Sequence, residues 1–124
     1  MKTMSKMALV AAAVAGTILS GTSHANQVFY RHDGELRDGW RQDLRIYMQR
    51  GLSYRFYGEC DLDCDDLDFE LFDQNGRLLD SDKKRDDVPI VEKWSGPSAY
   101  YTLRVSMANC DVNPCTYGVM GVAW

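Results

Sequence analysis

The stretch from Cys60 to Asp73 concentrates the side chains of this chain that can coordinate a cation. It reads Cys-Asp-Leu-Asp-Cys-Asp-Asp-Leu-Asp-Phe-Glu-Leu-Phe-Asp. Calcium takes about six to eight oxygen ligands, commonly loop carboxylates and backbone carbonyls. Crowded carboxylates also repel one another, and a bound cation would relieve that repulsion. The candidate calcium ligands are Asp63, Asp65, Asp66 and Asp68, with Asp86 or Asp87 brought in from a later loop.

The spacing of these acids does not make an EF-hand. Asp61, Asp63 and Asp65 match the start of such a loop, but Asp66 stands where glycine is needed and Phe72 where a bidentate glutamate is needed. The alternative is a solvated acidic loop. Its aspartates would cap turns or pair with the basic residues Lys83, Lys84 and Arg85. The sequence leaves both interpretations open.

Four cysteines offer a second kind of chemistry. They form two close pairs, Cys60 with Cys64 and Cys110 with Cys115. In an exported chain they indicate two disulfides, and local pairing is favoured because each short loop needs little ordering of the chain. Zinc is disfavoured because the spacings are not those of zinc knuckles and an oxidising compartment removes free thiolates.

The N-terminus has the layout of a secretory signal peptide. Lys2 and Lys6 precede an apolar run from Met7 to Leu19, and Ser23-His24-Ala25 is a small-x-small cleavage site. The run is shorter than the ~20 apolar residues of a spanning helix. We therefore expect residues 1–25 to be removed and residues 26–124 to form one domain without a membrane span, in the periplasm or outside the cell.

The charge of the expected mature chain is uneven. Of the 14 basic residues, Lys2 and Lys6 leave with the signal peptide, so the remaining 12 face 18 acidic ones. Residues 59–87 carry 12 acids against 4 bases, whereas residues 26–58 have a small basic excess. Nucleic acid is an improbable partner because its phosphates need a basic surface. Cations or a basic protein fit better.

The remaining pattern is that of short strands separated by turns. Asn75-Gly76 is a strong hairpin signal, and Pro89 requires an edge strand or a strand start. A helix competes over residues 36–48, where apolar residues also recur every four positions, but Gly39 disfavours it. Seven or eight such strands predict an antiparallel β-sandwich or jelly roll. The expected strands cover residues 27–30, 44–48, 54–57, 67–72, 77–79, 88–94, 99–107 and 115–124, with polar connections at 34–39 and 80–87.

Residues 44–107 resemble the bacterial pre-peptidase C-terminal domain, a small secreted β-sandwich module. The resemblance rests on Tyr-Arg-Phe-Tyr-Gly at 54–58, the acidic strand at 65–73, Asn75-Gly76, the aspartates at 80, 82, 86 and 87, and Gly96 followed by Tyr-Tyr-Thr-Leu-Arg-Val at 100–105. It implies a non-catalytic domain that often accompanies secreted proteases and sometimes binds calcium. From the family's acidic strand, only Asp66 and Asp68 are carried over as candidate ligands. The chain has no protease attached, and its cysteine pairs belong at most to a subgroup.

The same resemblance places the strand at 67–72 antiparallel to residues 103–107. Both cysteine pairs would then lie at one end of the sandwich. Crossed disulfides between the two pairs are therefore also conceivable.

Catalysis has little support in the sequence. His32 is the one histidine of the expected mature chain, and we expect it in an exposed loop; no glycine-flanked serine elbow is present. We therefore expect a non-catalytic binding or accessory module, with the acidic loop as a candidate site for stabilisation by calcium. One alternative is a carbohydrate-binding module, and another is a protease-associated or inhibitory domain. The aromatic residues that would offer a sugar platform are Trp40, Tyr54, Tyr57, Trp94, Tyr100 and Trp124.

Overall fold

The structure, a computed structural model, describes residues 26–124, and every regular element in that range is a β-strand. The expected signal peptide lies outside the described residues. Within the described range there is no helix long and apolar enough to cross a membrane. The strands are β2 (Gln27–Leu36), β3 (Arg41–Met48), β4 (Tyr54–Cys60), β5 (Cys64–Phe72), β6 (Leu78–Asp82), β7 (Ile90–Lys93), β8 (Ala99–Cys110) and β9 (Cys115–Ala123).

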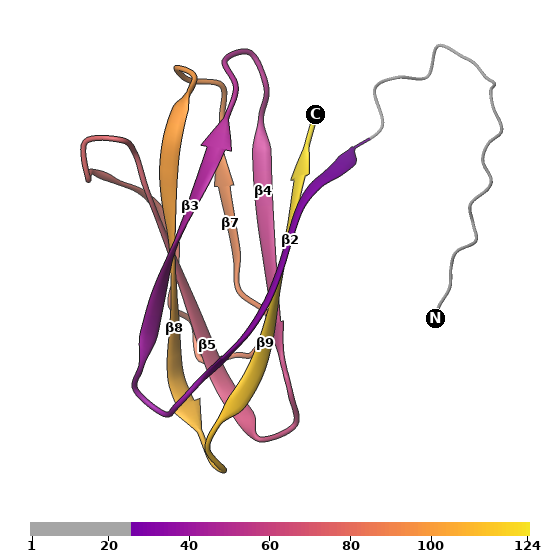
Figure 1. Cartoon of the computed structure of the whole chain (residues 1–124), viewed down its shortest axis with the longest axis vertical. Coiled ribbons are helices and arrows are strands. Elements are labelled where there is room, and N and C mark those ends of the chain that lie inside the picture. Colours follow the sequence, from indigo (N-terminus) through magenta and orange to yellow (C-terminus); the bar gives the residue numbers. More distant parts are fainter. Residues whose placement is uncertain (1–25) are drawn as a thin grey trace, which may run out of the picture.

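These strands form two antiparallel sheets, which confirms the predicted sandwich. One sheet has the order β2-β9-β4-β7 and the other β3-β8-β5-β6. The β2–β3, β4–β5 and β8–β9 connections lie at one end, and the β3–β4 and β7–β8 loops lie at the other (Figure 1). We call these the disulfide end and the loop end, because both disulfides lie at the first.

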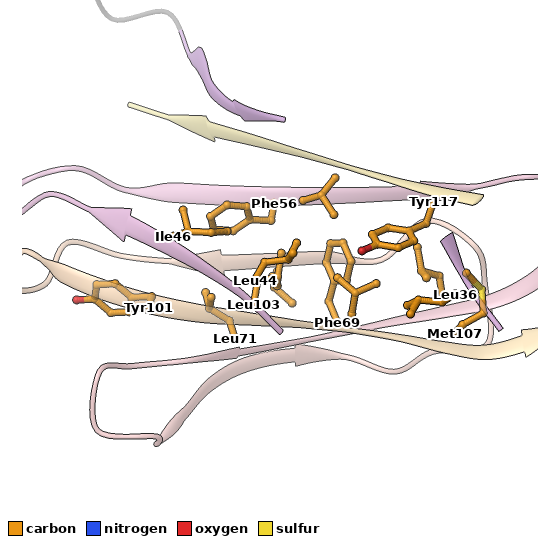
Figure 2. Close-up of a cluster of buried hydrophobic side chains, with 14 of the residues drawn as sticks. Leu36, Leu44, Ile46, Phe56, Phe69, Leu71, Tyr101, Leu103, Met107 and Tyr117 are labelled. Atoms are coloured by element: carbon orange, nitrogen blue, oxygen red, sulfur yellow. The ribbon is translucent and has the colours of Figure 1, made fainter. Parts of the chain in front are cut away.

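Alternation along each strand fills the space between the sheets. Leu67, Phe69 and Leu71 of β5 are buried, as are Leu103 and Val105 of the neighbouring β8. Figure 2 shows side chains from the two layers meeting in this core. The antiparallel pairing of β5 with β8 is as expected, with Leu67 opposite Met107 and Leu71 opposite Leu103.

Most strands differ at their ends from the expected ranges, and two of them continue into predicted connections. β2 continues to Leu36 through the predicted polar connection, because β9 pairs with it along its whole length. β6 extends to Asp82, into the predicted charged loop, because β5 offers it an edge. The helix considered for residues 36–48 is wrong, since Arg41–Met48 is a strand paired with β8.

Candidate functional site

The acidic stretch that begins at Cys60 divides into a stapled turn and a core strand. Disulfides join Cys60 to Cys64 and Cys110 to Cys115, which confirms local pairing. Cys64 also lies opposite Cys110 in the β5–β8 ladder, so the two disulfides are neighbours at one end. The crossed pairings are not formed.

The candidate calcium ligands do not converge on one point. Asp63 lies in the turn before β5, Asp65, Asp66 and Asp68 lie on β5, and Asp86 and Asp87 lie in the connection between β6 and β7. Among residues 26–124 no group of three or more His, Cys, Asp or Glu side chains is placed to hold a metal ion. The acids instead fall into pairs and caps.

Asp66 and Asp68 form the first carboxylate pair. Burial raises the pKa of Asp68 to about 6, helped by a hydrogen bond with Asp66 and by the negative charges of Asp66 and Asp82, while Lys83 opposes the rise. One oxygen of each carboxylate, Asp66 Oδ1 and Asp68 Oδ1, is buried without a hydrogen-bond partner. A buried acceptor without a donor is destabilising. Protonation of one carboxyl supplies a donor and relieves the repulsion.

Asp65 and Asp111 form the second pair, on the surface of the disulfide end. A hydrogen bond with Asp65 raises the pKa of Asp111, and the charges of Asp65, Asp63 and Asp38 act in the same direction. This pair is fully exposed to solvent, so its effect on stability is small.

Other aspartates accept hydrogen bonds from backbone N–H groups. Asp61 Oδ2 accepts from the N–H of Thr116 (2.8 Å) and from its hydroxyl (3.1 Å). The backbone bond of Thr116 is the main reason that the pKa of Asp61 is lowered. The predicted turn caps are also present, since Asp61 Oδ1 accepts from the N–H of Asp63 (3.1 Å) and Asp86 Oδ1 accepts from the N–H of Val88 (3.0 Å).

Two aspartates of β6 accept hydrogen bonds from backbone N–H groups at the edge of the other sheet. Asp80 Oδ2 accepts from the N–H of Glu92 (2.8 Å), and Asp82 Oδ2 accepts from the N–H of Ile90 (2.9 Å). These are N–H groups of β7, which forms the end of its sheet. Asp82 is itself buried. The expected pairing of acids with the charged loop also occurs, since Lys83 lies 3.2 Å from Glu70 and Lys84 lies 4.0 Å from Asp82.

A group of acids that the sequence analysis did not single out lies on the outer face of the other sheet. Asp33 of β2 and Glu59 of β4 flank Gly118 of the central strand β9. A methyl group on Gly118 would lie 3.1 Å from Asp33 Oδ1 and 3.4 Å from Glu59 Oε2. The two carboxylates therefore lean over the glycine and come within reach of one cationic group. Neither forms an ion pair with any other described residue.

A second row of acids lies next to the first. Glu35 of β2 pairs with Thr116 of β9, and Asp61 contacts Thr116 from the other side. A hollow of about 560 Å³ is lined by both rows. We call the four acids Asp33, Glu35, Glu59 and Asp61, with the floor of Thr116 and Gly118, the acid channel.

The acid channel adjoins a second, smaller hollow. An adjoining hollow of about 150 Å³ is lined by Arg31, Tyr57 and Met120 along with Asp33 and Glu59. Sequence reasoning missed the channel because its acids come from segments far apart in the chain. The available signal was the alternation of acids at 33 and 35, on one face of β2, and again at 59 and 61, where β4 ends.

The six predicted platform aromatics do not share one surface. Tyr54 is in the core, at 2% exposure, whereas Trp94 is 69% exposed. Trp94 packs edge-on against Trp124 with ring centroids 6.4 Å apart. Tyr100 packs on Tyr47 instead. Trp40 is exposed, packing on Arg37, and Tyr57 is half-buried in the hollow that adjoins the acid channel.

His32 is not in a loop, contrary to expectation. It lies on β2 and is partly buried, with Nε2 3.0 Å from the hydroxyl of Tyr117. That hydroxyl donates to Gln42 Oε1 at 2.5 Å. Burial raises the pKa of Tyr117 to about 12, so the hydroxyl keeps its proton and the three residues form a bridge between the sheets.

No protein-family model matches the chain, and no curated protein matches it either.

Proposed function

We propose that the chain is an exported, non-catalytic binding module that holds a basic segment of a partner protein in the acid channel. The observation that carries the proposal is the pair Asp33 and Glu59, which lean together over Gly118 and form no ion pair with any residue between 26 and 124. Like charges so close repel each other, and a cationic side chain between them would remove that cost. Charge complementarity of this kind favours fast and selective association.

The spacing of the channel fits an extended peptide. Its two rows of acids lie two residues apart along β9, at Thr116 and Gly118. A strand rises about 3.4 Å per residue, so the rows are about 7 Å apart. Alternate side chains of an extended segment have the same spacing. Arginines at positions i and i+2 would therefore each meet one row, and an apolar residue further along would reach Met120 and Tyr57.

Export is supported by two features. The layout of residues 1–25 is that of a signal peptide. The chain also has two disulfides, which are typical of proteins in oxidising compartments. The resemblance to pre-peptidase C-terminal domains agrees with a binding role and stays a prediction.

Calorimetry with a designed peptide tests the proposal. The probe is acetyl-Gly-Arg-Ser-Arg-Ser-Leu-Gly-amide, titrated into the oxidised chain at low and at physiological salt. We expect binding that weakens with salt. The double variant Asp33→Asn/Glu59→Gln should weaken it about tenfold, or about 1.4 kcal/mol.

Two controls separate the channel from overall charge. The variant Asp65→Asn/Asp87→Asn removes the same charge outside the channel and should bind normally. A peptide with adjacent arginines should bind more weakly than the alternating one. Equal loss of affinity in both double variants would mean that binding is non-specific and would refute the channel as the site.

Calcium is a second proposal, confined to Asp66 and Asp68. It is favoured by their two buried oxygens without donors. Two carboxylates are fewer ligands than calcium needs, so most of its shell would come from backbone carbonyls and water. Proton sharing satisfies the same oxygens without a metal. Calcium calorimetry, with melting curves in the presence and absence of chelator, decides between them. No heat at millimolar calcium and an unchanged melting temperature would refute calcium.

A further inference from the structure

A hollow of about 440 Å³ lies between the β5–β6 hairpin and the segment that follows β7. It is formed by Asn75 and Arg77 on the hairpin side and by Lys93, Trp94 and Gly96 on the other. The β7–β8 connection that contributes to it is at the loop end, far from the disulfides (Figure 1). It is therefore separate from the acid channel.

Lys93 is the unusual group in this hollow. This residue is only 6% exposed. Its Nζ donates one hydrogen bond, to the carbonyl oxygen of Trp94 at 3.0 Å. The rings of Tyr101 and Tyr54 lie 4.7 Å and 5.5 Å from the ammonium. An ammonium has three donors, so two are left without a protein acceptor within the described residues.

The carboxylates near Lys93 are already neutralised by other cations. Glu92 forms an ion pair with Arg55, and Asp73 pairs with Arg77 at 3.5 Å. Asp73 also accepts the backbone N–H groups of Asn75 and Arg77. Lys93 is in no ion pair with any residue between 26 and 124. Buried charges are normally paired, so the positive charge left over at this hollow lacks its anion.

Gly96 keeps the approach to the ammonium open. A methyl group on this glycine would lie 3.2 Å from Lys93 Nζ and 3.4 Å from the hydroxyl of Tyr101. The backbone there is not in the left-handed region, so the position does not require glycine for conformational reasons. The missing side chain instead leaves room next to the charge.

Trp94 gives the hollow an apolar wall. Its indole is 69% exposed and is held by its edge-on contact with Trp124. Gln74 and Asn75 also line the hollow and bring amide groups that can both donate and accept hydrogen bonds. A hollow that combines an aromatic ring with polar groups suits a sugar ring, which has apolar C–H faces and hydroxyls at its rim.

We propose that this hollow binds a uronic acid residue of a polysaccharide, with the sugar carboxylate on Lys93 and the ring against Trp94. The site supplies one unpaired cation for one carboxylate. It is independent of the acid channel, so either site can fail without the other.

Binding of trigalacturonic acid to the oxidised chain tests the proposal. Its trimethyl ester has the same rings without the charges and serves as the matched ligand. Calorimetry should show binding of the acid and at least tenfold weaker binding of the ester, because charge-assisted hydrogen bonds are the stronger ones. Equal binding of the two would overturn the assignment of the carboxylate to Lys93, and so would no binding of the acid.

Two variants locate the site. Gly96→Ala fills the space beside Nζ and should weaken binding of the acid about tenfold, as should Lys93→Met. Lys84→Met removes an exposed lysine elsewhere and should bind normally. Unchanged binding in Gly96→Ala, in a protein whose melting curve shows that it is folded, would overturn the proposal.

A spectroscopic measurement separates a binding role from a structural one. Burial lowers the pKa of Lys93. A bound carboxylate opposes that effect, so nitrogen NMR of the lysine side chains should show the Lys93 pKa rising when trigalacturonic acid is added. Acetate is the control for the sugar ring. If acetate binds as well as the sugar acid, the proposed sugar specificity is refuted.

Discussion

Asp61 and Asp68 lie seven positions apart in the same acidic stretch, yet the fold shifts their pKa values in opposite directions. Asp61 meets N–H and hydroxyl donors of Thr116, and its pKa is lowered. Asp68 meets another carboxylate, and its pKa is raised to about 6. The difference teaches that an acid-rich stretch has no single electrostatic character. Whether an aspartate stabilises this protein depends on whether a donor from another strand faces it.

The largest expected effect on stability comes from removing a buried carboxylate that accepts hydrogen bonds. Asp82→Ala would leave the N–H of Ile90 without its acceptor at the edge of β7. We expect a loss of about 2–3 kcal/mol in the free energy of unfolding, because Asp82 is buried and charged acceptors make the stronger hydrogen bonds. Urea unfolding measures it.

Asp87→Ala is the control for this variant, since Asp87 is exposed on the connection that follows β6. It should change stability by less than about 0.5 kcal/mol. Equal effects of the two would show that the bond to Ile90 contributes nothing.

A smaller loss is expected at the turn. Asp61→Ala removes the acceptor for both groups of Thr116. We expect about 1 kcal/mol of destabilisation, less than for Asp82 because this contact is exposed. Asp61→Asn keeps an acceptor oxygen and should recover part of the loss. A stabilised Asp61→Ala variant would contradict the role of this cap.

The opposite sign is expected for Asp68. Asp68→Asn removes the repulsion with Asp66 and should stabilise the protein at pH 7 by about 1 kcal/mol, after allowing for partial solvent screening. Asp66→Asn should act similarly, and the two gains should not add because each removes the same repulsion. Thermal unfolding at pH 7 measures both. Destabilisation by either would refute the repulsive pair and would favour a bound cation.

The same comparison predicts an acidic optimum of stability. The folded-state pKa of Asp68 is about 6, above its ordinary value of 3.8, so folding takes up a proton between these values and stability falls as pH rises through them. The lowered pKa values of Asp43, Asp61 and Asp73 act in the other direction, and their stabilisation is lost as pH falls below about 4. We expect the melting temperature to peak between about pH 4 and 5. In the Asp68→Asn variant, the melting temperature should depend less on pH above pH 5. A maximum of the wild-type melting temperature at pH 7 would contradict the prediction.

The smallest effect is expected for the exposed pair. Asp111→Asn removes repulsion from Asp65. Because this carboxylate is fully exposed, the melting temperature of the Asp111→Asn variant at pH 7 should rise less than that of the Asp68→Asn variant. Differential scanning calorimetry of the two variants side by side checks the order. A reversed order would mean that burial is not what separates the two pairs.

The sequence by itself determined the fold class and the strand faces of this protein, and it favoured the local disulfides. Alternation placed Leu67, Phe69 and Leu71 inside because side chains of a strand point to opposite faces, a property of the local backbone. Asn75-Gly76 likewise marked its turn, and Gly76 has the positive φ of 84° that such a turn uses. Close cysteine pairs needed little information from the rest of the chain.

Only the tertiary structure decided which charges face each other. The acid channel joins residues of β2 and β4 across β9, and Asp80 and Asp82 meet donors from the other sheet. Lys93 is shielded from solvent because the rings of Tyr54 and Tyr101, from two strands, cover its ammonium group. Electrostatic energies depend on distance and burial, and neither is a property of neighbouring positions in the chain. The pattern of aspartates was therefore visible in the sequence, whereas their division into caps, repelling pairs and a channel was not.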